Sequence, residues 1–459
     1  MTQQGVRWTT DQVLALAPDA ASRRAGSRLG AAGPWSEVGS SDEGAVWGLC
    51  KGSGSEPYRT VVDVADASGP AYACGCPSLK FPCKHALGLL LLWAGGAAAV
   101  PGAEAPEWAQ RWIAGRRGRG QGVRAVADGT EGTEGSPAPS AGSGDPEAAR
   151  RRAARRAERI TAGATELEQR LADLLRGGLA GAEQAGHGLW EETAARMVDA
   201  QAPGLASRVR ELGSIPSSGP GWPVRLLEEC ALLHLLDQGW SRREGLPDGL
   251  AATVRSRVGL PAAADGPPVR DRWLVLAQYD TSDARLTTRR IWLHGAETDR
   301  TALLLSYGAA GRAPEQALPV GLALEAELSA YPGAGQRRAA LGRRFTPPEP
   351  TRTRPRGVTT SQAAVRYGDA LRDDPWLDSV PVTLGGVVPV PDGGSWQLAD
   401  ADGDTALPLA RSAGNHPGLW RLVALSGGAP VTVFGECGHR GFTPLTAWPT
   451  GPGPAVPLC

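Results

Sequence analysis

Four side chains that commonly bind metal ions lie close together near the start of the chain. Cys74-Gly-Cys76 is followed, after six residues, by Cys83-Lys-His85, so three thiols and one imidazole fall within twelve positions. Residues i and i+2 of a strand or tight turn point the same way, so the first two thiols can reach one ion, and Gly75 lets the backbone bend. Cys83 and His85 are expected to begin a helix, whose positive end supports a thiolate. The spacing predicts a structural Zn²⁺ site with a closed tetrahedral Cys3His shell.

The context of the cluster also favours metal over disulfides. The chain has seven cysteines, an odd number, and its first residues have no apolar signal segment. Clustered thiols in a reducing compartment indicate metal binding, and the alternative is a group of buried thiols around a helix start. Three thiolates and one imidazole around Zn²⁺ carry one net negative charge, which Lys80 and Lys84, two of only three lysines, can partly balance.

The residues around the cluster predict a small sheet followed by a helix. Runs rich in β-branched and aromatic residues at 45–50 and 58–64 flank a Gly/Ser/Pro turn and indicate a hairpin, which residues 71–76 can extend. An apolar run at 86–93 ends at Gly95-Gly96, as a helix with a glycine cap does. Such a unit is marginal alone, whereas structural zinc contributes roughly 10 to 16 kcal/mol. We therefore expect residues 1–114 to form a zinc-stapled domain.

The rest of the chain divides by composition and periodicity. Residues 115–145 are Gly, Ser, Pro and charge, which predicts a flexible linker, and residues 146–262 have helical spacing that predicts helices at 146–177, 189–212, 224–238 and 250–258. Strand-like runs at 272–279, 290–293 and 301–306 predict an antiparallel meander within residues 263–342. The fold class expected is multidomain α+β with an all-α middle region and a β-rich C-terminal half.

The last part begins after a second break. Residues 343–356 are rich in Pro and Arg and are expected to form a linker. Residues 357–459 predict a β-rich domain with a short helix near 362–371 and strands at 380–390, 419–425 and 430–434.

The order C-x-C-x6-C-x-H, between a hairpin and an apolar helix, resembles the bacterial SWIM zinc finger family. The resemblance covers residues 45–95 most directly. It implies that Cys74, Cys76, Cys83 and His85 bind zinc and that the protein binds DNA or another protein. Proteins of this resemblance also occur beside MoxR-type AAA+ ATPases and von Willebrand A-domain proteins, which implies an adaptor role as the alternative. This chain has no recognisable ATPase or transposase domain.

The charge of the chain limits the ways in which it can bind nucleic acid. Lysine plus arginine equals aspartate plus glutamate at 48 each, which excludes a globally basic nucleic-acid binder. A local basic stretch follows Trp108 and Trp112, which can stack on bases, and its alternative is a solvated linker. The residues predicted to contact nucleic acid are Lys80, Lys84, Arg116, Arg117 and Arg119.

An enzyme is not expected. The chain contains no Walker A, H-E-x-x-H or G-x-S-x-G pattern, and a catalytic site within residues 263–459 would have no known motif behind it. No apolar run reaches the roughly 20 residues that a membrane span needs, and with no signal segment the sequence predicts a cytoplasmic protein.

Overall fold

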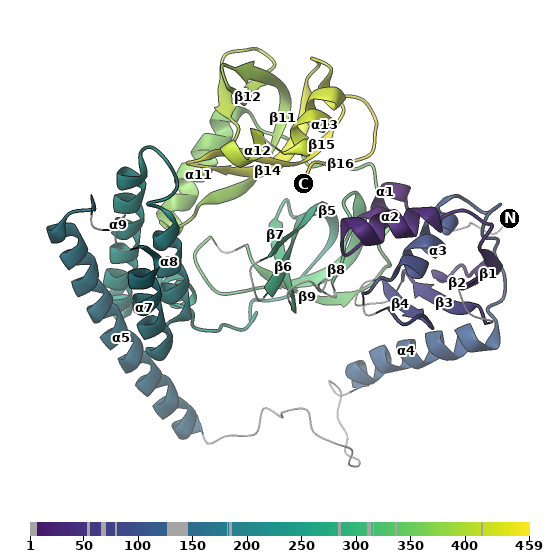
Figure 1. Ribbon diagram of the computed structural model, residues 1–459, viewed down its shortest axis with the longest axis horizontal. Coiled ribbons are helices and arrows are strands. Elements are labelled where there is room, and N and C mark those ends of the chain that lie inside the picture. The colour runs from purple at the N-terminus through teal and green to yellow at the C-terminus, as the bar shows by residue number, and fades with distance from the viewer. Residues whose placement is uncertain are drawn as a thin grey trace.

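The computed structural model describes residues 7–52, 56–65, 70–78, 80–125, 146–180, 182, 186–282, 286–309, 314, 316–335, 337–414 and 416–459. It combines helices and antiparallel sheets, with a helical middle region and a sheet-rich C-terminal half, and so confirms the expected α+β class (Figure 1). None of the helices in the described part has the length and apolar character needed to cross a membrane.

The N-terminal unit is a four-stranded sheet in the order β1-β2-β3-β4. Its elements are α1 (Thr10–Leu14), α2 (Ala20–Arg28), β1 (Trp35–Ser40), β2 (Ala45–Cys50), β3 (Tyr58–Asp63), β4 (Ala71–Cys74), α3 (Lys84–Ala94) and α4 (Glu107–Ala125). Side chains alternate across a strand, so Val46 and Val62 join the core that contains α3, while Trp47 and Val61 pack with α4. The two helices therefore cover opposite faces of the sheet.

The linker was expected to begin at residue 115, but helix α4 occupies this part of the chain. The helix continues to Ala125, well past residue 115, and residues 126–145 lie outside the described part of the chain. Its apolar side, which includes Trp108 and Trp112, packs against the sheet and anchors the helix, and the Ala, Gln and Arg residues among its glycines favour continued helix. Both tryptophans are partly buried against the sheet, so only part of each ring is left for the expected stacking on bases.

The middle region is a bundle of antiparallel helices with its own core. Its elements are α5 (Pro146–Gly177), α7 (Gly186–Asp199), α8 (Pro203–Ser214), α9 (Trp222–Ser241), a 3-10 turn η1 (Arg243–Gly245) and α10 (Asp248–Arg257). The single helix expected at 189–212 is two helices. The break is explained by Pro203 at the first position of α8 and by Gln201, whose φ of 60° is left-handed.

The second sheet has the order β10-β8-β5-β6-β7, with β9 paired to β8, and contains the predicted meander. Its strands are β5 (Val269–Ser282), β6 (Leu286–Gly295), β7 (Thr301–Ala309), β8 (Leu322–Ala330), β9 (Ala339–Arg344) and β10 (Glu349–Pro350). The linker expected at 343–356 therefore contains the end of β9 and all of β10. Pro350 is tolerated because β10 lies at the sheet edge, where its missing N–H costs no ladder bond.

The third sheet has the order β13-β12-β11-β14-β15-β16. Its region comprises α11 (Thr360–Asp373), β11 (Ser379–Asp392), β12 (Ser395–Asp400), β13 (Ala406–Pro408), α12 (Arg411–Gly414), α13 (Pro417–Ser426), β14 (Val431–Gly438), β15 (Gly441–Trp448) and β16 (Val456–Pro457). The strand expected at 419–425 is helix α13. Pro417 at its first position and Gly427, left-handed at its end, are helix-boundary signals, and Leu419 and Leu422 are buried at helical spacing.

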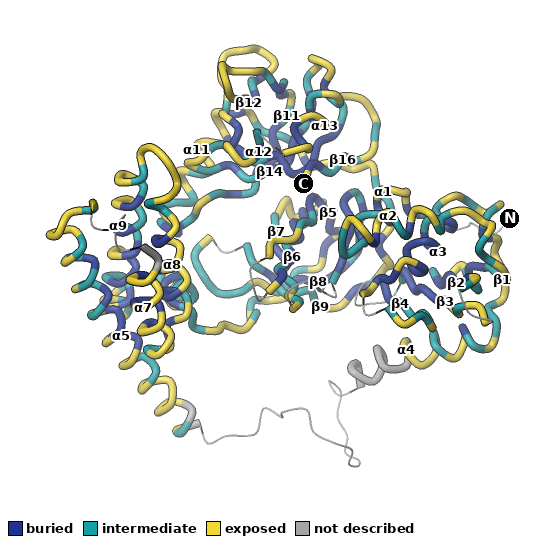
Figure 2. The backbone as a smooth tube through the Cα atoms, viewed as in Figure 1, coloured by how far each residue is buried: buried dark blue, intermediate teal, exposed yellow. Residues whose placement is uncertain are grey.

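The three sheets share cores instead of forming separate domains. In β5, Trp273 and Val275 belong to the core that also contains α3 and the first sheet, whereas Leu274 and Leu276 pack with Phe434 and other residues of the third sheet. The second sheet is therefore buried on both faces, as the dark segments around β5 and β8 in Figure 2 show. The expected boundaries between 1–114, 263–342 and 357–459 cut through these cores.

Candidate metal centre

The four predicted ligands meet at the junction between β4 and α3. Cys74 ends β4, Cys76 lies in the following turn, Cys83 is the N-cap residue of α3, and His85 lies in its first turn. Their ligand atoms all lie within 4.8 Å of one another, and no other such group occurs among the described residues. Cys83 and His85 are buried, and both other cysteines are partly exposed.

The distances within the cluster fit a tetrahedral ion. With Zn–S near 2.3 Å and Zn–N near 2.1 Å, a sulfur and a nitrogen ligand stand about 3.6 Å apart. Cys74 Sγ lies 3.6 Å from His85 Nδ1. The same geometry places two sulfurs about 3.8 Å apart, so the widest separation of 4.8 Å closes with small side-chain rotations. Zn²⁺ held by these four residues would have a full shell and would supply folding energy rather than an activated water.

Strand β3 supplies a layer of support that the sequence analysis missed. Thr60 is paired with Cys74 across the ladder, and its hydroxyl lies 3.3 Å from Cys74 Sγ. The ring of Tyr58 lies 4.9 Å from that of His85, centroid to centroid, and restricts its orientation. Groups that orient ligands in this way tune a metal site. The pairing of β3 with β4 could have revealed the contact of Thr60, because it sets Thr60 opposite Cys74.

Helix α3 contributes to the site through its N-terminus. The backbone N–H of Ala86 donates to Cys83 Sγ at 3.5 Å, so the sulfur caps the helix. This bond favours the Cys83 thiolate, the effect that the sequence predicted, but the hydrogen bond to Cys74 and burial outweigh it and raise the pKa of Cys83.

The thiols compete for protons when no cation is present. A hydrogen bond from Cys83 lowers the pKa of Cys74 to about 3, and the same bond raises the pKa of Cys83 above its ordinary range. Burial raises the pKa of Cys76. One thiolate is therefore stabilised by protonated neighbours, and a divalent cation would replace those protons.

Comparison with known proteins agrees with this geometry. A closed Cys3His cluster between a hairpin and a helix defines the class of structural zinc fingers. Residues 58–94 match the SWIM zinc finger, and residues 155–258 match the SWIM-associated four-helix bundle domain. With the cluster, these matches support a zinc-binding SWIM protein and confirm the resemblance to SWIM zinc fingers. No curated protein and no solved structure matches the chain.

The residues predicted to contact nucleic acid lie in two places. Lys80 and Lys84 lie beside the metal ligands, and Lys80 Nζ is 2.6 Å from Asp19 Oδ2. That hydrogen bond lowers the pKa of Asp19 to about 2. Arg116 is exposed on α4, on the opposite face of the sheet from α3, and the side chains of Arg117 and Arg119 lie outside the described residues. The described side chains thus do not form one continuous cluster.

Proposed function

We propose that the protein is a noncatalytic interaction protein whose zinc finger contacts DNA. The observation that carries this proposal is Phe81, whose side chain is 49% exposed directly before the ligand turn into α3. Lys84, exposed in the first turn of α3, and Lys80, which is paired with Asp19, flank it, so a ring and the positive charge of Lys84 lie beside the metal ligands. Aromatic rings stack on bases and ammonium groups contact phosphates, the two features of sequence-tolerant nucleic-acid binding.

Exposed arginines on α4 and at the start of α5 also support a polyanionic partner. Arg116 is exposed near the end of the described side chains of α4, and α5 begins with exposed arginines at 150, 152 and 155. The first buried core residue of α5 is Ile160, so these arginines precede the part of the helix that packs in the bundle. They add charge without being needed for the core.

A closed metal shell supports the noncatalytic part of the proposal. Catalytic zinc sites keep a position open for water or substrate, whereas Cys74, Cys76, Cys83 and His85 supply all four ligands of a tetrahedral ion.

The test is a salt titration of DNA binding by the zinc-loaded full chain, measured as fluorescence anisotropy of a labelled 30-base-pair duplex. Phosphate contacts make affinity fall steeply with salt, by about one unit of log–log slope for each contact. We expect a measurable slope, reduced by Lys84→Ala, and weaker binding with Phe81→Ala. Arg255→Ala, an exposed arginine of the helical bundle, serves as the control and should change neither. No binding at low salt would reject DNA as the partner.

A protein partner is the second candidate, and helix α9 favours it. Val224, Leu227 and Leu235 on this helix are 62%, 48% and 43% exposed, and their spacing places them near one side of the helix. An exposed apolar stripe suits a protein surface rather than phosphate. The partner that the SWIM resemblance suggests is a MoxR-type AAA+ ATPase with a von Willebrand A-domain protein. Binding to such a purified ATPase, lost in Leu227→Glu and retained in Phe81→Ala, would favour this function.

A further inference from the structure

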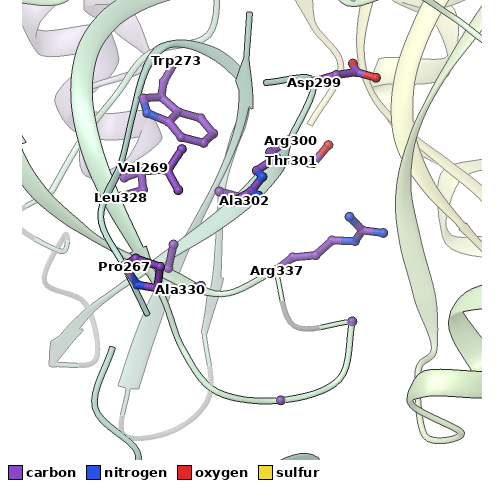
Figure 3. A pocket seen from close by; sticks show the side chains of 13 residues that line it. Pro267, Val269, Trp273, Asp299, Arg300, Thr301, Ala302, Leu328, Ala330 and Arg337 are labelled. Atoms are coloured by element: carbon purple, nitrogen blue, oxygen red, sulfur yellow. The ribbon is translucent and has the colours of Figure 1, made fainter. Parts of the chain in front are cut away.

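A pocket opens at one end of the second sheet, away from the metal ligands. It has a volume of about 500 Å³, within the range of small-molecule sites. Its floor is apolar and comes from three strands: Val269 and Trp273 of β5, Ala302 of β7, and Leu328 of β8 (Figure 3). Trp273 is 2% exposed and is fixed by a hydrogen bond from its Nε1 to the carbonyl oxygen of Ala326.

The loop between β8 and β9 forms one wall of the pocket. Gly333 and Gly335 line it, with φ of 143° and 59°, conformations that other residues rarely adopt. The backbone of the loop is tied to β7, because Leu303 N–H donates to the carbonyl oxygen of Arg337 at 2.7 Å. The pocket therefore has a defined wall rather than a loose edge.

The rim of the pocket is positively charged. Arg300 and Arg337 both line it, and Figure 3 shows the guanidinium of Arg337 extending beyond the apolar floor. Burial lowers the pKa of Arg337, and the charge of Arg366 on α11 lowers it further. Asp299 is the acidic residue among the described lining residues, and it faces His294, with Oδ1 3.5 Å from Nε2. A half-buried guanidinium beside an apolar floor is suited to bind an anion.

We propose that this pocket binds a small organic anion, with a carboxylate, sulfonate or phosphate on Arg337 and an apolar body over Trp273 and Leu328. Thr301, also on the rim, has a hydroxyl that can donate a further hydrogen bond to the anionic group. The site is separate from the zinc finger and does not depend on DNA binding.

Isothermal titration calorimetry on the zinc-loaded full chain tests the proposal with two probes of one shape, 2-naphthoate and uncharged 2-naphthamide. We expect 2-naphthoate to bind at least tenfold more tightly. Arg337→Leu should weaken 2-naphthoate at least tenfold and leave 2-naphthamide unchanged, and Arg337→Lys should lose less because it keeps the charge. Ala330→Trp, at an exposed lining position, should weaken both probes by filling the pocket. Arg372→Leu, an exposed arginine on α11, is the matched control and should behave as the unmodified protein.

Three results would overturn the assignment. They are no measurable binding of 2-naphthoate, indole-3-acetate and phenyl phosphate alike, equal binding of the charged and uncharged naphthalenes, and unchanged 2-naphthoate affinity in Arg337→Leu. Circular dichroism checks that each variant is folded. If Arg337→Leu does not fold, Arg337→Lys and Ala330→Trp decide the outcome, and unaltered 2-naphthoate binding in both would reject the site.

Discussion

Arg257 and Asp374, 117 residues apart, form a two-pronged ion pair between the helical bundle and the C-terminal region. Nε of the arginine donates to Oδ1 at 2.9 Å, and Nη2 donates to Oδ2 at 2.5 Å. The two side chains are only 20% and 11% exposed, so solvent screens the pair weakly. Close by, Trp376 Nε1 donates to the carbonyl oxygen of Leu232, which ties the same two regions together.

We expect Asp374→Ala to destabilise the protein by about 2 kcal/mol or more, because it leaves a largely buried guanidinium unpaired. The thermal unfolding midpoint, compared in Asp374→Ala, Arg257→Ala and the double variant, measures the coupling. The exposed pair Arg372–Asp369, at 3.8 Å, provides the control, and Asp369→Ala should cost well under 1 kcal/mol. Equal effects of Asp369→Ala and Asp374→Ala would contradict this account.

Zinc content tests the four ligands directly. The purified chain should hold one zinc, and Cys76→Ser or His85→Ala should lose it, because a three-ligand shell leaves the ion exposed. Cys459→Ser changes an exposed cysteine outside the cluster and should retain the full amount. Metal analysis after gel filtration gives the answer, and full zinc in both ligand variants would disprove the assignment.

The pH dependence of stability should reveal Asp237, which lies on α9 in the bundle core. This residue is 1% exposed, and among the described residues neither of its carboxyl oxygens has a hydrogen-bond partner. Burial, with the charge of Glu168 as a smaller cause, raises the pKa of Asp237 to about 8. The folded state therefore holds the proton more tightly than the unfolded chain, where the pKa is near 3.9.

The sign follows from linkage. The contribution of Asp237 to the free energy of unfolding is fully present below about pH 4. It falls as the pH rises toward 8 and is constant above 8. Asp237→Asn cannot ionise, so unfolding midpoints measured from pH 5 to 9 should decline less in this variant, with a gain of a few kcal/mol relative to the unmodified protein at pH 9. Glu158→Gln, at an exposed position of α5, should leave the profile unchanged. Parallel profiles for Asp237→Asn and the unmodified chain would show that this carboxyl is not the cause.

The arginines of α4 can be tested separately from the zinc site. Replacing Arg116, Arg117 and Arg119 together by alanine should weaken binding to DNA of any base sequence. It should also reduce the dependence of affinity on salt, since each phosphate contact contributes close to one unit to the log–log slope. Zinc content should not change, because the ligands lie on the other side of the sheet. A triple variant at exposed positions, Arg255, Arg372 and Arg411, controls for net charge. If affinity and slope survive the α4 substitutions, the protein-adaptor function gains support.

The metal site was predictable because its determinants are local. Cys74, Cys76, Cys83 and His85 fall within twelve residues, and the turn and the helix start bring them together without distant contacts. The contribution of Thr60 depends on strand register, which residue spacing alone does not give.

Long-range packing is what the sequence left undecided. The apolar run that includes Trp273, Leu274, Val275 and Leu276 is typical of a strand buried on both faces, but it does not say which elements cover each face. Trp108 and Trp112 carried the same ambiguity, since an exposed stacking surface and a helix packed on a sheet use the same residues. The strand predicted at 419–425 was wrong for a local reason. Pro417 and Gly427 are typical of the two ends of a helix, but the prediction gave more weight to the apolar residues between them.

The shared core also determines what a break in the chain would do. Leu87 and Leu90 of α3 lie in the same apolar cluster as Trp273 and Leu324, which come from the far side of the helical bundle in sequence. A protease cut between α4 and α5 would therefore leave two fragments held together by buried side chains, with no free zinc-bearing piece. The part that ends with α4 and the part that begins with α5, synthesised as separate polypeptides, should therefore assemble through this shared core.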